Sequence, residues 1–214
     1  MRILLLDTLG LISAVAIGII VIYFSLSYAV QNFILLLSFL ILSVIATKYR
    51  HEEKREKGLY EHERGWQNVL SNGSIPALCV ILYAATLSNN FLTAFICSLS
   101  AATADKFASE LGVLSEKPIS LKNLKRVRPG TSGAVTFLGT FMSFIGSLLI
   151  GVLAYFLFKF DPLLIFSIAI VGFVGSVVDT IAGIAEEEGI GNKSTSNILC
   201  TIAGMIGGYF FIHF

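Results

Sequence analysis

Three carboxylates stand inside, or at the end of, long apolar stretches of this sequence: Asp105, Glu110 and Asp179. A charged carboxylate in the middle of a membrane helix costs at least ~2.5 kcal/mol, so such a residue usually marks a functional site. Small residues, Ser176 among them, flank Asp105 and Asp179 at helical spacing and leave room beside each acid for an ion or a phosphate. Tight helix packing would account for the small residues but not for the acids. The three carboxylates are therefore candidate metal ligands.

Two polar segments rich in Gly, Ser and Thr, 128–133 and 191–197, lead into later apolar stretches. The first backbone N–H groups of a helix are unpaired, and the helix dipole favours an anion there. Either segment alone would simply cap a helix. Beside buried acids, the two together favour a phosphate held with Mg²⁺, which proteins bind through one or two carboxylates plus substrate phosphates. The candidate phosphate-binding residues are Gly130, Thr131, Ser132, Gly133 and Asn197.

A third polar segment, 64–73, opens another apolar stretch and contains Arg64, Asn68 and Asn72. An amide inside the membrane is costly without a partner, which makes Asn72 the most informative of them. Trp66 in the same segment is either part of a base-binding surface or an interfacial anchor. No His or Cys residues have zinc-ligand spacing, and no P-loop signature is present, so neither zinc chemistry nor a P-loop nucleotide fold is expected.

Long apolar helices must position these residues. The chain has 214 residues, of which 55% are hydrophobic and only 14% charged, whereas soluble domains carry about 25% charged residues. A bilayer core needs about 20 apolar residues in a helix. The sequence therefore predicts an all-α polytopic membrane bundle, a single integral membrane domain over 1–214, with about seven transmembrane helices near 9–29, 33–47, 69–87, 91–111, 134–158, 163–184 and 196–214.

Most of the 15 Lys and Arg residues fall in the segments 48–68 and 112–133, which seven spans would place on one side of the membrane. The positive-inside rule makes these segments cytoplasmic loops, puts the N-terminus inside and the C-terminus outside, and predicts a multi-pass protein of the cell membrane. Glu–Lys pairs within 48–68 favour a charged helical extension of the second stretch. Gly204 and Gly208 would pack either inside the bundle or between copies in a homo-oligomer.

Several of these motifs, taken together, resemble one membrane family over residues 60 to 214. They are Arg64 with the segment 68–73, and the segments 104–112, 128–133 and 175–179, followed by Asn197. The family is the integral-membrane one that includes plant phytyl-phosphate kinase and its archaeal and animal relatives, and it is distantly related to dolichol kinase. Relatives carry Thr-Trp where this chain has Lys106-Phe107.

The resemblance implies a CTP-dependent kinase that converts a prenyl monophosphate, of the phytyl or geranylgeranyl type, into the diphosphate. Its partners would be CTP, an isoprenoid phosphate and the bilayer, with no nucleic acid, and its cofactor Mg²⁺. The catalytic residues would be Asp105, Asp179 and Arg128, and Glu110 would complete the metal ligands. Substrate or nucleotide would be bound by Arg64, Asn68, Asn72, Gly130, Thr131, Ser132, Gly133, Ser176 and Asn197.

Other functions remain open at the level of sequence. A cytidylyltransferase would join CMP to a lipid phosphate and release pyrophosphate. An ion- or proton-coupled carrier would also place acids beside glycine-rich helices, but it would need them near the midplane with access from both sides. A purely structural membrane protein would leave the three acids unexplained.

Overall fold

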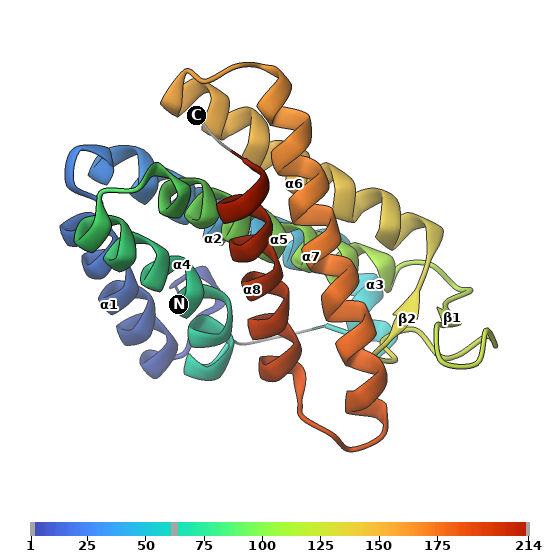
Figure 1. The fold of residues 1–214 in the computed structure, drawn as a ribbon. Coiled ribbons are helices and arrows are strands. Elements are labelled where there is room, and N and C mark those ends of the chain that lie inside the picture. The colour runs from blue at the N-terminus through green and yellow to red at the C-terminus, as the bar shows by residue number, and fades with distance from the viewer. Residues whose placement is uncertain (1–2, 61–63, 213–214) are drawn as a thin grey trace.

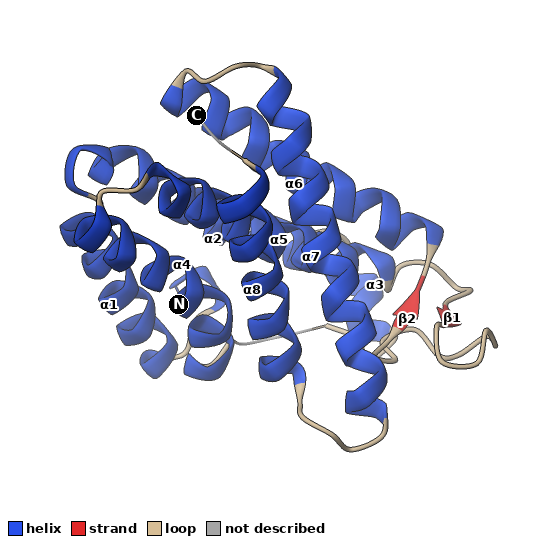
Figure 2. Ribbon diagram, in the orientation of Figure 1, coloured by secondary structure: helices blue, strands red, loops and turns tan. Residues whose placement is uncertain are grey.

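The computed structural model describes residues 3–60 and 64–212. Helices dominate it, and the strands form one small hairpin (Figures 1 and 2). Short 3-10 turns, η1 (Ile3–Leu5) and η2 (Leu26–Tyr28), flank the first helix. The remaining elements are α1 (Thr8–Phe24), α2 (Ala29–Lys48), α3 (His51–Glu56), α4 (Trp66–Thr86), α5 (Asn89–Gly112), β1 (Ile119–Ser120), β2 (Ala134–Val135), α6 (Phe137–Phe158), α7 (Leu163–Glu187) and α8 (Lys193–Phe211).

Seven long helices correspond to the seven predicted stretches, and the prediction of an all-α polytopic membrane bundle is confirmed. Five of them, α2 with its preceding turn, α4, α5, α6 and α7, are long and apolar enough to cross a membrane. Helix α1 is apolar but has 17 residues, and α8 has 19. The count of seven spans and the orientation remain predictions. The end of the last predicted stretch, 213–214, lies outside the described residues.

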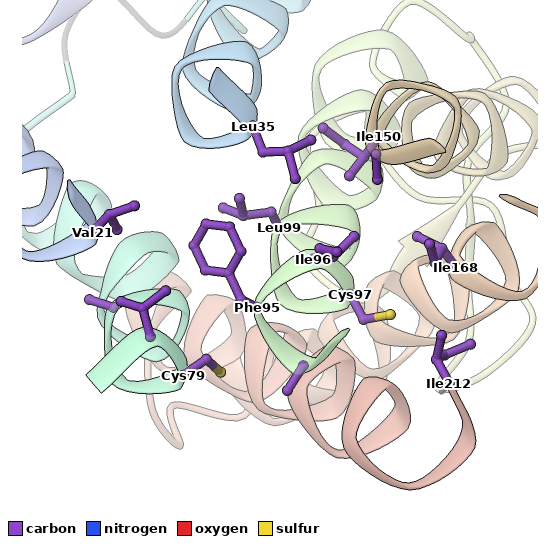
Figure 3. Close-up of a cluster of buried hydrophobic side chains, with 14 of the residues drawn as sticks. Val21, Leu35, Cys79, Phe95, Ile96, Cys97, Leu99, Ile150, Ile168 and Ile212 are labelled. Atoms are coloured by element: carbon purple, nitrogen blue, oxygen red, sulfur yellow. The ribbon is translucent and has the colours of Figure 1, made fainter. Parts of the chain in front are cut away.

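Helix α5 forms the centre of the bundle. It packs against α2, α4, α6, α7 and α8. Of the residues in its most apolar 18-residue stretch, 89% are buried. Figure 3 shows Phe95 and Leu99 of α5 pointing toward Val21 of α1, within a cluster that also includes Cys79 of α4. Because α5 is covered on all sides, most of its residues are apolar or small.

Glycines and hydroxyls allow the neighbouring helices to approach α5 closely. A methyl group added at Gly208 of α8 would lie 2.6 Å from the backbone oxygen of Thr93, and one at Gly204 would lie 2.5 Å from that of Cys97. The Thr93 hydroxyl in turn donates to the Gly208 carbonyl at 2.8 Å. These contacts place Gly204 and Gly208 inside the bundle, packed against α5. Of the two alternatives, packing inside the bundle and packing between copies, the structure shows the first.

The polar connections gather at one end of the bundle. Figure 1 shows α3, the β1–β2 hairpin and the α7–α8 connection toward the lower right, and the α1–α2, α4–α5 and α6–α7 connections toward the upper left. The basic segments therefore lie together, as the seven-span arrangement requires.

One local prediction is wrong, and one helix begins a few residues later than expected. The segment 48–68 is not a helical extension of α2, because α2 ends at Lys48, Arg50 adopts a left-handed conformation with φ 50°, and α3 begins a separate short helix. Helix α6 begins at Phe137 rather than 134, because the preceding residues pair with β1 and Thr136 caps the helix by accepting a hydrogen bond from the Gly139 amide.

Candidate functional site

Asp105 and Asp179 converge on one ammonium group. Asp105 lies on α5 and Asp179 on α7, and both are at least 95% buried. Lys193, the first residue of α8, places its Nζ 2.7 Å from Asp179 Oδ2 and 3.7 Å from Asp105 Oδ1. Three helices thus bring two acids and one cation to a single point. The structure thus brings together two of the three carboxylates that the sequence marked as candidate metal ligands.

Each aspartate keeps one oxygen without a partner. Asp105 Oδ2 and Asp179 Oδ1 are buried and accept no hydrogen bond from any described residue. A buried carboxylate oxygen without a donor is costly unless a proton or a bound ligand satisfies it. Proteins usually hold Mg²⁺ through one or two carboxylates, and substrate phosphates complete its coordination shell. The two aspartates match this set of protein ligands. The residues present therefore fit this ion, although three acids or histidines do not cluster anywhere in the described part of the chain.

A cavity of about 270 Å³ opens beside the aspartates. Its walls come from α5, α6 and α7, and the segment 129–136 closes it. The cavity therefore joins many of the predicted residues in one place. Its polar lining includes Asp105, Ser109, Thr131, Ser132, Thr140, Ser143, Ser176, Asp179, Thr180 and Lys193, together with the backbone of Gly130 and Gly133.

The segment 129–133 lines this cavity as a turn, not as the start of a helix. Gly130 and Gly133 have φ of 88° and 68°, and a methyl group at Gly133 would contact the Ile184 backbone. The Ser132 backbone N–H donates to Glu187 and its hydroxyl donates to Glu186. The anion-binding donors predicted for Ser132 are thus occupied by carboxylates of α7.

Arg128 lies just before this segment, is exposed and does not line the cavity. Its carbonyl accepts from the Thr131 N–H at 3.2 Å in a turn, and no contact joins its side chain to the aspartates among the described residues. Arg128 is therefore not part of the site that contains the two aspartates.

Glu110 belongs to a different cluster on the other side of α5. Its Oε2 accepts from Lys54 at 3.1 Å, and its Oε1 accepts from Thr47 at 2.7 Å and lies 3.6 Å from Arg64. Arg64 also donates to the Thr47 hydroxyl and to the Ser43 carbonyl. Two cations already neutralise Glu110, so we do not include it or Arg64 among the ligands of the aspartate site.

The predicted asparagines lie at the start of α4 and α8. Asn72 donates to the Asn68 carbonyl at 2.8 Å, and Asn197 donates to Ser71 at 3.3 Å. Asn197 Oδ1 is buried and accepts no hydrogen bond from a described residue. Neither asparagine of α4 lines the cavity beside the aspartates.

Asn68 and Asn72 instead line a second cavity, of about 370 Å³, among α1, α2 and α4. Apart from these two amides and Arg64, its lining is almost entirely apolar. The predicted site residues therefore do not share one cavity. Arg64, Asn68 and Asn72 line the apolar cavity, and Glu110, Arg128 and Asn197 line neither of the two.

A family described as "Integral membrane protein DUF92" matches residues 1–208, almost the whole chain. The chain belongs to this family. The protein is accordingly an integral, multi-pass membrane protein.

Three relatives of this DUF92 protein show how far the similarity extends. The Uncharacterized membrane protein MJ0933 of Methanocaldococcus jannaschii is 40% identical over 206 residues, which cover 95% of this chain and 84% of that protein. Protein VTE6, chloroplastic, of Arabidopsis thaliana is 25% identical over 64% of this chain, and Protein PGR of the same plant is 30% identical over 70%. This chain spans only 44% and 62% of those two plant proteins. No solved structure matches it.

Sequence reasoning on this DUF92 protein missed Lys193. Lys193 lies in the segment 191–197 but was not among the predicted site residues. Asn192 caps α8 and so places Lys193 in the first turn of that helix, facing the aspartates. A lysine beside a capping Asn and two Ser/Thr residues is a common surface pattern, and only the packing of α8 on α7 shows its partner.

Proposed function

We propose that the protein is a membrane-embedded phosphotransferase that moves the γ-phosphate of a nucleoside triphosphate, CTP by preference, onto a prenyl monophosphate. The observation that carries this proposal is the convergence of Asp105, Asp179 and Lys193 at a polar cavity. The family resemblance supports an isoprenoid phosphate as acceptor, since the family includes a plant phytyl-phosphate kinase. The membrane location supports it too, because the acceptor is a lipid.

Phosphoryl transfer needs positioning and charge neutralisation more than covalent chemistry. In the proposed reaction, an oxygen of the acceptor phosphate forms a bond to the γ-phosphorus of CTP, the bond between that phosphorus and the β-bridging oxygen breaks, and CDP leaves. The acceptor oxygen is already anionic, so a strong general base is not required.

The residues of the polar cavity would take defined roles in this step. Asp105 and Asp179 would hold Mg²⁺, which supplies charge neutralisation at the donor's phosphates when bound. Lys193 is 47% exposed along its side chain, so its ammonium can turn from the aspartates toward a bound phosphate. Ser176 lies one turn before Asp179 on the same wall and would donate its hydroxyl to a phosphate oxygen.

The test is incubation of the purified protein with CTP, Mg²⁺ and a panel of prenyl monophosphates, followed by separation of the lipid and nucleotide products. We expect a prenyl diphosphate together with CDP. Release of pyrophosphate would instead show cytidylyl transfer, and ion flux in proteoliposomes without nucleotide would support a carrier. Either result would overturn the kinase proposal.

A further inference from the structure

Ser143 carries a buried hydroxyl on α6. The residue is 2% exposed, and its Oγ makes no hydrogen bond with any described residue. Ser147, one turn later on the same face of α6, donates instead to the Phe144 carbonyl at 2.9 Å. Serines of buried helices commonly satisfy the hydroxyl by such a bond within the helix. A buried hydroxyl without a partner is costly unless a bound ligand satisfies it.

Ser143 lines the polar cavity that contains the two aspartates. One turn before it on α6, a methyl group at Gly139 would lie 3.2 Å from the Gly112 Cα of α5. One turn after it, a methyl group at Gly146 would lie 3.0 Å from the Thr103 carbonyl oxygen of α5. Ser143 lies between these two contacts, so it belongs to the part of α6 that runs beside the first aspartate.

Ser176 of α7 lines the same cavity on the wall opposite Ser143. Helices α6 and α7 meet one turn deeper, where a methyl group at Gly172 would lie 2.8 Å from the Ser147 Cβ. Ser143 precedes Ser147 by four residues and Ser176 follows Gly172 by four, and the two helices run in opposite directions (Figure 1). The two serines therefore lie at a similar level, one on each wall. Two hydroxyls and two carboxylates, from three helices, thus line one polar space.

The cavity has an inner end and an exposed end. Away from the polar connections, the lining of α5, α6 and α7 ends at Asp105, Ser143 and Phe173. Asp105 and Ser143 are only 3% and 2% exposed. Beside the polar connections, Gly130 is exposed and Thr131 is half-buried. A water-soluble ligand that enters beside these connections therefore brings its leading end to Ser143.

We propose that the donor nucleotide enters this cavity with its phosphates first and that Ser143 binds its terminal phosphate. The proposal rests on the proposed function, because it orients the donor of that reaction. The serine hydroxyl donates a charge-assisted hydrogen bond to a phosphate oxygen, which satisfies its own burial. This orientation places the phosphate to be transferred at the inner end of the cavity and the base beside the segment 129–133.

The experiment measures nucleotide binding without an acceptor. The affinities of CTP and CDP are compared, with Mg²⁺ present, for the unaltered protein, for Ser143→Ala and for the matched control Ser147→Ala. We expect Ser143→Ala to weaken CTP binding about tenfold and to leave CDP binding nearly unchanged, because CDP lacks the phosphate that the hydroxyl binds. Ser147→Ala should bind both nucleotides as the unaltered protein does, because the Ser147 hydroxyl is already bonded within α6.

Melting temperatures without nucleotide separate binding from packing. Ser143→Ala removes a hydroxyl that has no partner, so its melting temperature should equal or exceed that of the unaltered protein. Ser147→Ala loses a hydrogen bond and should melt at a lower temperature. A lower melting temperature for Ser143→Ala, with unchanged CTP affinity, would assign the residue to packing and overturn the proposal.

Equal CTP affinity of Ser143→Ala and the unaltered protein would also overturn the proposal, as would an equal loss of affinity for CTP and CDP. Absence of CTP binding by the unaltered protein would overturn both this proposal and the kinase proposal. Selective loss of CTP binding in Ser143→Ala, together with no prenyl diphosphate in the transfer assay, would support the binding role and overturn the kinase proposal alone.

Discussion

Asp105 and Asp179 lie on helices separated by the whole of α6, and yet the two carboxylates share the Lys193 ammonium at 3.7 and 2.7 Å. This arrangement is costly to assemble, because two acids of like charge are buried with a single cation. The buried oxygens Asp105 Oδ2 and Asp179 Oδ1 accept no hydrogen bond from a described residue, which leaves them available to a bound cation. The first predictions follow from this relationship.

Replacing either aspartate should abolish transfer without unfolding the protein. Asp105→Asn and Asp179→Asn keep the side-chain volume but remove the negative charge that would hold Mg²⁺, so the phosphates would lose the charge neutralisation that the ion supplies. We expect kcat for prenyl diphosphate formation to fall about 100-fold or more. Asp161→Asn, in the exposed α6–α7 connection, is the matched control and should keep normal turnover. Near-normal turnover in both site variants would exclude the assigned role.

Lys193 should compete with a divalent cation for the two aspartates. Without its ammonium the carboxylates repel each other, so Lys193→Gln should have a lower melting temperature in the absence of metal. Added Mg²⁺ should then raise the melting temperature of this variant by more than it raises that of the unaltered protein. Lys122→Gln removes an exposed ion pair with Glu188 and should leave the Mg²⁺ response unchanged. The same Mg²⁺ response in Lys193→Gln and in the unaltered protein would contradict the competition.

Glu110 should contribute to stability and not to turnover. It neutralises Lys54, whose side chain is fully buried, so Glu110→Gln should destabilise the protein by about 3–5 kcal/mol. Thermal unfolding in detergent measures the loss, and the folded fraction should keep its kcat. The double variant Lys54→Met with Glu110→Gln should recover part of the stability, because it removes the uncompensated cation. Normal stability with lost turnover would return Glu110 to the catalytic site.

The close approach of α7 to α5 depends on Gly172. A methyl group there would lie 2.2 Å from the Ser100 hydroxyl, which itself donates to carbonyls of α6 and α7. Gly172→Ala should therefore destabilise the bundle by about 1–3 kcal/mol through overpacking. Gly18→Ala is the matched control, since the nearest atom to its methyl group would be 3.6 Å away. Equal melting temperatures for the two variants would show that the helices separate without cost.

Much of the fold follows from hydropathy alone, since helix length and apolar content depend on nearby residues. Small residues flank both Asp105 and Asp179 at helical spacing. This pattern indicated that each acid has room beside it for an ion or a phosphate. Long-range partners could not be predicted in this way. The contact of Glu110 with Lys54 depends on how α3 folds back over the end of α2, and a left-handed Arg50 sets that reversal.

Turn geometry limited the sequence interpretation as well. The segment 128–133 has the residues of a helix start, but pairing of Ala134 with Ser120 extends the chain and delays α6 to Phe137.

The most direct test of the central claim uses CTP labelled on either the γ-phosphate or the α-phosphate. The labelled CTP is incubated with Mg²⁺ and geranylgeranyl monophosphate, and the labelled products are identified. With the purified protein, label on the γ-phosphate should appear in geranylgeranyl diphosphate while label on the α-phosphate remains in CDP, and Asp105→Asn should give neither product. Transfer of the α-label to the lipid, or equal transfer by Asp105→Asn, would contradict the account.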